Sequence, residues 1–376
     1  MSRLARLQLI VTDDGRVRCD ERMAWLRKIS YLVEGMKITT LESETKLWDD
    51  FVHGQATARG PHLSGWKRVI EETFGHTCIY LMASGNGQVR GVLPLVHMRS
   101  RLFGSFLVSI PFLNYGGIVS EDPIVRKNLF DFACALAAER RAEYVELRHE
   151  SPLLENLPTK QHKVAMLLDL PDKSEGLWNR FKPKLRSQIR KPMKEGLVAR
   201  IGREEELGNF YEVFTANMRD LGTPVYSKNF FATILKHFPD SSWIASVSLN
   251  KRPLAAGFLF GFRDTLEIPW ASSLRRYNHL AANMLLYWSV LEFAIQQGYQ
   301  RFDFGRSSPG EGTYKFKEQW GAQPVPLHWQ YWLGNGTQLP NLSPTNSKYH
   351  LAISVWQKLP LFLTRWIGPA IVRHIP

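Results

Sequence analysis

Apolar and polar positions predict the same order of elements in both halves of the chain. In the first half, apolar runs predict four strands and one helix: strands at 77–83, 89–97, 106–110 and 144–147, and a helix over 123–141. Gly85-Asn86-Gly87 lies between the first two strands and predicts a tight hairpin, because Asn and Gly tolerate positive φ. Asp122 and Pro123 suit the N-cap and the first position of the helix.

The second half repeats this order with different residues. Its apolar runs predict strands at 243–248, 254–262, 265–271 and 301–304, and a helix over 280–297. Gly298 follows that helix as a C-terminal cap. We therefore expect an α/β (α+β) protein with two tandem domains, each a mixed, mostly antiparallel sheet flanked by helices.

The predicted division of the chain has four parts. They are an irregular N-terminal extension (1–35), a first domain (36–166), a second domain (167–335) that opens with a basic linker helix (178–196), and a C-terminal tail with an amphipathic helix (336–376). An uncharged run at 102–120 contains a proline and several polar residues, which predict a strand, a turn and a second extended piece. We expect no transmembrane segment.

Charge and cysteine usage narrow the class of protein. The chain has 48 Lys and Arg against 35 Asp and Glu, a net charge of +13, which favours anionic partners such as nucleic acid, phosphorylated carriers or anionic lipid. Cys19, Cys78 and Cys134 are widely spaced and odd in number, so neither a disulfide framework nor a zinc site is expected. The eleven His show no metal-binding spacing. This composition favours the reducing cytoplasm.

The most informative segment is 302–321. A predicted strand ends at Gly305, a turn with Gly310 and Gly312 follows, and a short helix starts near Thr313. The N-terminus of a helix after such a turn presents free N–H groups, which suit a phosphate or a developing oxyanion. Lys315 and Lys317 are two residues apart and point to different helix faces, so one can face a cleft while the other is solvated.

The run FDFGRS…GTYKFKEQWG…PLHWQYW resembles the C-terminal signature of FemAB-related proteins, especially the branch associated with exosortase/PEP-CTERM loci. Four further segments are similar to the same branch: 111–117, 219–226, 269–273 and 343–346. The resemblance implies two tandem domains of the GNAT acetyltransferase type (BioF2-like) from residue 36 onward. It also implies a transferase that moves an acyl or aminoacyl group onto an amine of a cell-envelope or exopolysaccharide precursor.

The resemblance also implies roles for single residues. Lys317 matches a family lysine that stabilises the oxyanion of the tetrahedral intermediate. Asp303 and Arg306 either orient the acceptor or pair with each other, and Asp303 is a candidate general base if its pKa is raised. Tyr314 is either a proton donor to the leaving group or a packing residue. The remaining residues expected to contact substrate are Tyr226, Trp270, Ser307, Gly310 and Gly312.

The donor is left between two classes, neither of them a tightly bound cofactor. Acetyl-CoA enzymes of this fold carry R-R-x-x-G-x-[G/A], which Arg275, Arg276 and Ala281 match, but His279 stands where the key glycine belongs. A side chain at that position obstructs a close approach of phosphate. This departure favours aminoacyl-tRNA over acyl-CoA.

The basic segment offers Arg186, Arg190 and Lys191 as contacts for phosphate, because guanidinium pairs with phosphate in a bidentate manner. It resembles the element that precedes the second domain in FemAB-related proteins, which implies a nucleotide-linked or nucleic-acid partner, tRNA included. The alternative is a solvated basic face, interrupted by Pro192.

The tail from Tyr349 to Pro376 is apolar and basic, so it can lie on a membrane surface, although docking on the protein body is the preferred interpretation. Pro360 and Pro369 are expected to break it into short helices. Interfacial contact would place the enzyme at the inner face of the membrane, near a carrier-linked acceptor. Two alternatives to the FemAB reaction stay open: an acyl-CoA-dependent N-acetyltransferase and a non-catalytic protein that binds anionic precursors.

Overall fold

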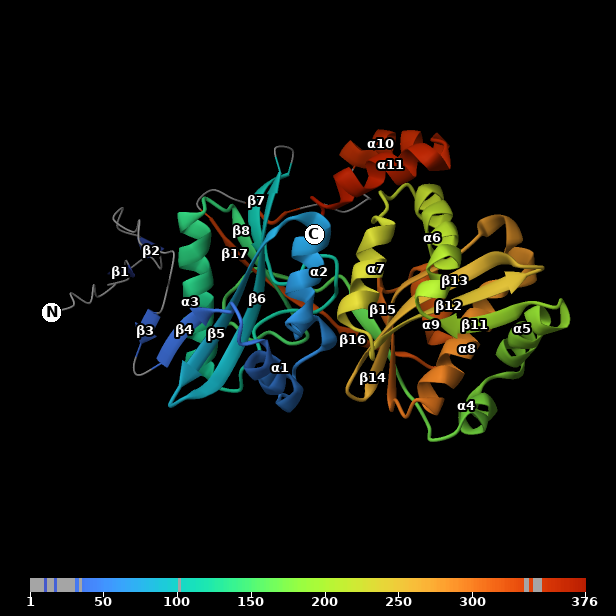
Figure 1. Cartoon of the computed structure of the whole chain (residues 1–376), viewed down its shortest axis with the longest axis horizontal. Coiled ribbons are helices and arrows are strands. Elements are labelled where there is room, and N and C mark those ends of the chain that lie inside the picture. Colours follow the sequence, from blue (N-terminus) through green and yellow to red (C-terminus); the bar gives the residue numbers. More distant parts are fainter. Residues whose placement is uncertain are drawn as a thin grey trace.

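The computed structural model describes residues 36–376 except 101–102, 335–337 and 341–346, together with three short strands nearer the N-terminus. These strands are β1 (Ile10–Val11), β2 (Val17–Arg18) and β3 (Tyr31–Val33). The rest of the predicted extension 1–35 lies outside the described residues. Two sheets lie side by side and form the body of the protein (Figure 1).

The first sheet has eight strands in the order β3-β4-β5-β6-β7-β8-β17-β9. Beyond β3 they are β4 (Met36–Thr40), β5 (Thr77–Gly85), β6 (Gln88–Ser100), β7 (Gly104–Val108), β8 (Tyr144–His149), β9 (Thr159–Lys160) and β17 (His328–Leu333). Helix α3 (Pro123–Glu139) packs on one face, and α1 (Thr45–Gly54) and α2 (Gly65–Phe74) pack on the other. As predicted, the Asp122 side chain caps α3 by accepting a hydrogen bond from the Ile124 amide.

The second sheet has seven strands in the order β11-β12-β13-β14-β15-β10-β16. They are β10 (Val164–Asp169), β11 (Val198–Gly202), β12 (Ser242–Leu249), β13 (Arg252–Phe262), β14 (Thr265–Ser273), β15 (Arg301–Ser307) and β16 (Gln323–Pro326). Its helices are α4 (Ser174–Arg180), α5 (Pro183–Lys194), α6 (Leu207–Leu221), α7 (Lys228–His237), α8 (Ala282–Gln296) and α9 (Gly312–Glu318). Helices α6 and α7 cover one face and α8 covers the other (Figure 1).

The two sheets repeat one plan, which confirms the predicted fold class. In each sheet a turn whose two central residues both have positive φ joins the strands of the central hairpin. These residues are Asn86 (52°) and Gly87 (76°) in the first sheet, and Asn250 (51°) and Lys251 (67°) in the second. Such turns match the right-handed twist of the strands they join. Each sheet also has one parallel pair, β7–β8 and β14–β15, with α3 and α8 as the crossover helices.

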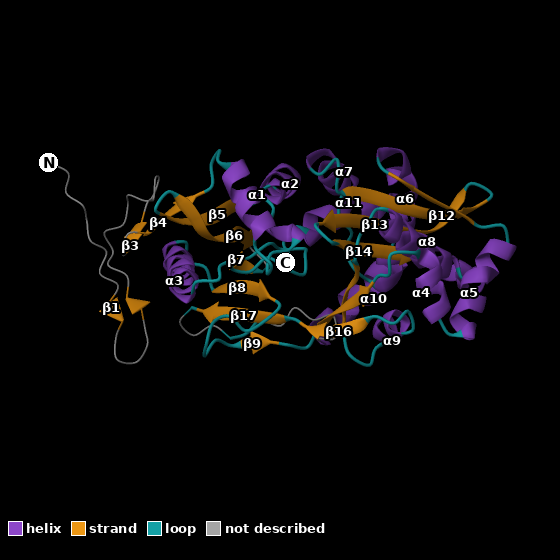
Figure 2. Ribbon diagram, turned by 90° about the horizontal axis from the view of Figure 1, so that it is seen from below, coloured by secondary structure: helices purple, strands orange, loops and turns teal. Residues whose placement is uncertain are grey.

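The two sheets do not follow the predicted domain boundary between residues 166 and 167, because each contains one strand from beyond that boundary. Strand β10 crosses that boundary and pairs with β15 in the second sheet, and β17, inside the predicted range 167–335, pairs with β8 in the first. In both places the incoming strand is antiparallel and covers the open edge of a parallel pair. Each sheet is therefore completed by a segment that follows the other sheet in sequence. Figure 2 shows β17 between β8 and β9.

Helices α2 and α7 join the two domains through aromatic side chains. The ring centroids of Trp66 and Phe238 are 5.2 Å apart, and those of Phe74 and Phe230 are 5.1 Å apart. All four rings belong to one buried cluster that continues from the first domain into the second. Burial of this much aromatic surface fixes how the domains sit against each other.

The tail forms α10 (Ser347–Lys358) and α11 (Leu361–Val372), which pack on α6, so the docking interpretation is confirmed. Pro360 separates the two helices as expected. Pro369, however, lies inside α11 and does not break it, because the neighbouring turns are held against the body through buried Thr364 and Gly368. Among the helices that the structure describes, none has the length and apolar character needed to cross a bilayer.

Candidate active site

Two buried carboxylates meet where the parallel strands of the second sheet separate. Strands β14 and β15 pair only from Thr265–Arg301 to Glu267–Asp303, so Glu267 and Asp303 form the last pair before the strands diverge. Both side chains are buried. Burial raises the pKa of each carboxyl group, and the charge of Asp303 raises the pKa of Glu267 further. This pair therefore favours binding at least one proton.

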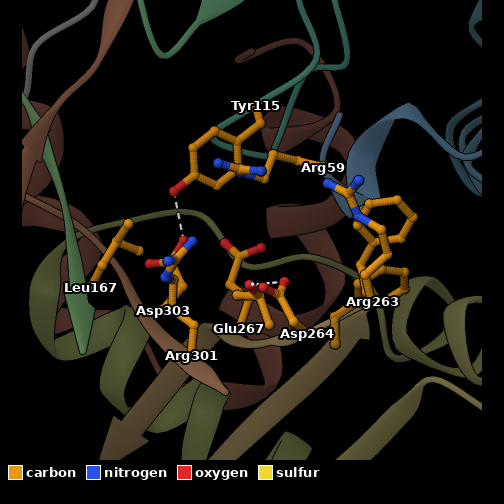
Figure 3. Close-up of a pocket in the computed structure, with 12 residues that line it drawn as sticks. Arg59, Tyr115, Leu167, Arg263, Asp264, Glu267, Arg301 and Asp303 are labelled. Carbon is orange, nitrogen blue, oxygen red and sulfur yellow. Dashed lines mark hydrogen bonds between the residues drawn. The ribbon is translucent and has the colours of Figure 1, made fainter. Parts of the chain in front are cut away.

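The first domain supplies hydrogen-bond donors to this pair. The loop that follows β7 enters the junction, where the Tyr115 hydroxyl donates to Asp303 Oδ2 at 2.5 Å and Asn114 Nδ2 donates to Glu267 Oε1 at 3.3 Å. The Gly305 amide donates to Asp303 Oδ1 at 2.7 Å. The carboxylates are thus oriented by both domains (Figure 3).

A cavity of about 30 Å³ lies beside the carboxylates. Figure 3 shows Tyr115 and Arg59 on one side of it and Asp303 and Glu267 on the other. Arg59 does not neutralise the pair, because its guanidinium forms an ion pair with Glu150 at 2.9 Å. A volume near that of one water molecule is too small for a substrate, so this cavity itself is not a substrate pocket.

Lys317 lies on α9 with its side chain directed into the protein. Its Nζ donates to the carbonyl oxygens of Gly305 at 3.0 Å and Arg306 at 2.9 Å. Burial lowers the pKa of Lys317 to about 8, although Asp303 and Glu267 oppose this shift. Lys315 is exposed. The two lysines thus point to different helix faces, as expected, and Lys315 is solvated; Lys317 lies in the protein interior and lines none of the cavities described for the structure.

Arg306 follows Gly305 on β15 and extends to the surface. Its guanidinium lies 5.4 Å from the ring of Trp329, and that of Arg148 lies 4.2 Å from the same ring. In the part of the chain that the structure describes, Arg306 forms no ion pair with Asp303, so the pairing alternative is wrong. Asp303 is instead satisfied by a hydroxyl and an amide.

Tyr226 and Trp270 also lie at this junction. Their ring centroids are 6.1 Å apart in an edge-on arrangement. Burial raises the pKa of Tyr226 to about 12, while the charges of Arg306 and Arg148 act in the opposite direction. The structure thus brings Tyr226 and Arg306, predicted from separate motifs, into one electrostatic environment.

The other residues predicted from the 302–321 segment have varied surroundings. Tyr314 is half-buried and packs against the core, which matches its packing interpretation. Ser307 is buried, and its hydroxyl has no hydrogen-bond partner among the residues that the structure describes. Gly310 adopts φ 80°, which suits glycine, and Gly312 begins α9.

Arg186, Arg190 and Lys191 lie on α5, outside the junction. Helix α5 packs on α8 and continues through Pro192 to its end at Lys194. A hollow of about 360 Å³ separates it from the end of α9; its lining includes Arg180, Lys182 and Lys184. Among the described residues, none of the cations on α5 forms an ion pair, so this face is free to receive an anion.

The segment that resembles the CoA-binding motif in part is exposed at the surface. Arg275, Arg276 and His279 lie in a short 3₁₀ helix, and Ala281, which precedes α8, adopts the left-handed conformation with φ 53°. Within the described ranges, no group of three or more His, Cys, Asp or Glu is placed to hold a metal ion.

Sequence reasoning missed the residues that the other segments supply to the site. Asn114 and Tyr115 lie in the matched segment 111–117, to which no role was given. Glu267 is the single charged residue in an otherwise apolar or neutral strand, TLEIPWASS. A lone carboxylate in a buried strand was the available signal, because such a group needs partners.

Comparisons with known proteins agree with the observed fold. Residues 179–318 match a family model described as an acetyltransferase (GNAT) domain. A crystal structure of FemX is similar with a TM-score of 0.62 at 14% identity, covering 77% of this chain and 96% of that one. No curated protein matches the chain.

Two further structures show the same likeness. The C-terminal domain (DUF2156) of a putative lysylphosphatidylglycerol synthetase from Agrobacterium fabrum gives a TM-score of 0.54 at 12% identity, over 77% of this chain and 92% of that one. A tandem GNAT protein from the clavulanic acid biosynthesis pathway gives 0.50 at 10% identity, over 81% and 100%.

At these identities the structural likeness shows the fold alone: two tandem GNAT-like domains, as predicted. The match of residues 179–318 to an acetyltransferase domain supports an acyltransferase. GNAT domains use their acyl donor as a substrate and not as a tightly held cofactor.

Proposed function

We propose that the protein transfers an acyl or aminoacyl group from an activated donor to an amine at the junction of its two domains. The observation that carries this proposal is the position of Lys317. Its ammonium group, with a pKa near 8, lies beside the buried pair Asp303 and Glu267 where β14 and β15 separate. A cation and a proton acceptor in one buried place are the two groups that acyl transfer to an amine requires.

The proposed reaction follows from these two groups. The acceptor amine attacks the carbonyl carbon of the donor, and a C–N bond forms as the carbonyl oxygen becomes an oxyanion. Lys317 stabilises that oxyanion. The nitrogen loses a proton to Asp303, the bond to the leaving group breaks, and the leaving thiolate or alkoxide takes up a proton. The net exchange is one acyl group for one proton.

The raised pKa of Asp303 suits the role of base. A carboxylate with an ordinary pKa is a weak acceptor for an ammonium proton, and burial makes it a stronger one. Tyr115 holds one oxygen and the Gly305 amide holds the other, which fixes the direction of the acceptor lone pairs. Both domains are therefore needed for the proposed chemistry.

For the donor, we propose an anionic carrier that contacts Arg186, Arg190 and Lys191. Among the described residues the cations of α5 form no ion pair, so they can bind phosphate groups, and the hollow at the start of this helix adds Lys182 and Lys184 opposite Glu318. Aminoacyl-tRNA and acyl-CoA both meet this description; the side chain of His279 favours the first, and the GNAT match favours the second. Both donors are made in the cytoplasm, where the proposal places the reaction.

For the acceptor, we propose an amine on a carrier-linked precursor of the cell envelope or of an exopolysaccharide. The basis is the resemblance of 302–332 to the exosortase-associated branch of FemAB-related proteins. Arg306, exposed and 5.4 Å from the ring of Trp329, is the proposed contact for an anionic group of this acceptor.

The proposal is tested by incubating the full chain with acetyl-CoA or with charged tRNA and a panel of amines, with products identified by mass spectrometry. We expect N-acylated product from one donor class, and a rate that falls about 10²–10³-fold in Lys317→Ala. Lys315→Ala, two residues away and exposed, is the matched control and should keep the native rate. Equal rates in both variants would refute the mechanism, and binding of anionic precursors without product would favour the non-catalytic alternative.

A further inference from the structure

The tail helices have an outer face that the body does not cover. Packing on the protein body buries Trp356, Thr364, Gly368 and Val372. On the opposite side, the side chains of Trp366, Leu351 and Phe362 are 78%, 77% and 69% exposed. Among the described residues, these are the three most exposed large hydrophobic side chains of the protein. Scattered apolar residues are ordinary on surfaces, but three in one helical pair form a patch.

The spacing of these residues places them together along the helices. Phe362 and Trp366 are four apart on α11, and Leu351 is four residues from Val355 on α10, which is also exposed. Residues four apart lie on the same helix face. Each helix therefore carries two exposed apolar side chains on one of its faces, and both helices lie over α6 at the edge of the molecule (Figure 1).

The charge of this region has one sign. The sequence contains no Asp or Glu after Glu318, while the tail holds Lys348, Lys358, Arg365 and Arg373. Arg365 and Arg373 hydrogen-bond to the body, and Lys358, at the end of α10, is exposed. A second copy of a chain with net charge +13 would bring like charges together, whereas an anionic surface would be attracted.

We propose that α10 and α11 form a membrane-docking surface, which seats the protein on an anionic lipid bilayer with Phe362 and Trp366 inserted among the headgroups. Tryptophan suits this depth because its ring is apolar and its N–H is polar. The helices are already folded on the body, so docking on lipid does not have to order them. This inference is independent of the transferase reaction.

The anchoring of the tail gives this surface a fixed orientation. The His76 ring and the Phe74 carbonyl of the first domain hydrogen-bond to Arg373, and Thr215 on α6 of the second domain bonds to Arg365. The two helices are thus tied to both domains. Docking would then hold the whole enzyme in one attitude toward the lipid.

The test is vesicle flotation of the full chain. Vesicles of phosphatidylcholine alone are compared with vesicles that contain phosphatidylcholine and phosphatidylglycerol in similar amounts. We expect binding to the anionic vesicles, and a loss of roughly tenfold or more in the double variant Phe362→Ser/Trp366→Ser, because two large apolar groups no longer insert. The matched control, Leu47→Ser/Ile124→Ser, removes two exposed apolar residues elsewhere and should bind like the native chain.

Two further measurements keep the test decisive. Arg190→Ala/Lys191→Ala removes cations from α5 and should leave vesicle binding intact. Loss of vesicle binding in this variant would place the lipid contact on α5 and overturn the proposal. Size-exclusion chromatography should show the same oligomeric state for the native chain and the tail variant. A native dimer that becomes a monomer in Phe362→Ser/Trp366→Ser, or equal flotation of this variant and the control, would also overturn it.

Discussion

Glu146 in the first domain and Asp303 in the second occupy equivalent places, since each belongs to the last parallel pair before two strands separate. Their surroundings differ. Glu146 forms an ion pair with Arg148 at 2.8 Å and accepts a hydrogen bond from the Tyr331 hydroxyl at 2.9 Å. Asp303 faces a second carboxylate, Glu267, and is held by neutral donors.

The difference separates two uses of one position in a repeated fold. In the first domain the buried charge is compensated by its neighbour, so the position stabilises the structure. In the second, burial raises the pKa of Asp303 although Tyr115, the Gly305 amide and Lys317 act in the opposite direction, which leaves a group that can exchange protons. The same strand geometry therefore supports packing in one domain and chemistry in the other.

The largest expected effect is on activity, in Asp303→Asn. We expect the transfer rate to fall by about 10²–10⁴-fold, because the proposed base is lost. The free energy of unfolding should stay the same or increase, since a buried carboxyl with a raised pKa is replaced by a neutral group of the same shape. Steady-state rates and urea unfolding of one preparation measure both. A large loss of stability would show that Asp303 serves the structure as Glu146 does.

The second effect is on stability, in Glu146→Gln. Removing this charge leaves Arg148 buried without its counter-ion, so the free energy of unfolding should fall by about 3–5 kcal/mol. Glu139→Gln, an exposed change on α3, is the control and should be neutral. The comparison between domains breaks if Glu146→Gln is fully stable yet inactive.

A third, smaller effect concerns the donor. Arg186→Ala/Arg190→Ala should raise the KM for the anionic donor by roughly tenfold, equivalent to one charge-assisted hydrogen bond, with kcat retained. Lys228→Ala, exposed on α7, should leave KM unchanged. A fall in kcat with constant KM would place these arginines in the chemistry and contradict the assignment.

The smallest effect is a shift in pH dependence. If Lys317 acts as a cation, the rate should fall as pH rises above about 8. Glu267→Gln removes a charge that raises the pKa of Lys317, so the alkaline limb should move to lower pH. The free energy of unfolding should also depend on pH. Between pH 8 and 10.5 the lysine binds more protons in the unfolded state than in the folded state, so the contribution of Lys317 to the free energy of unfolding increases with pH. If the alkaline limb of the pH–rate profile does not move in Glu267→Gln, Glu267 does not influence the pKa of Lys317.

Local sequence patterns predicted the features of the fold that depend on residues close together in the sequence. The hairpin at Asn86-Gly87, the cap at Asp122 and the different directions of Lys315 and Lys317 all follow from spacing or turn chemistry within a few residues. The partners of Asp303 did not follow, because Tyr115 lies 188 residues away and periodicity reports which face of a strand is buried, not what packs on it. The exchange of β10 and β17 was missed for the same reason: an apolar strand does not specify its neighbour.

The exchanged strands also constrain how the chain is built. During synthesis the first sheet keeps β8 with an open edge until residues 328–333 leave the ribosome, some 180 residues later. An exposed edge strand is a site for wrong pairing, so β8 needs protection over that interval. Neither half, expressed alone, would have a complete sheet, and the two should refold together from denaturant in a single cooperative step. Gene fragments cut near residue 166 would therefore yield two unstable pieces, and co-expression of both should restore the protein.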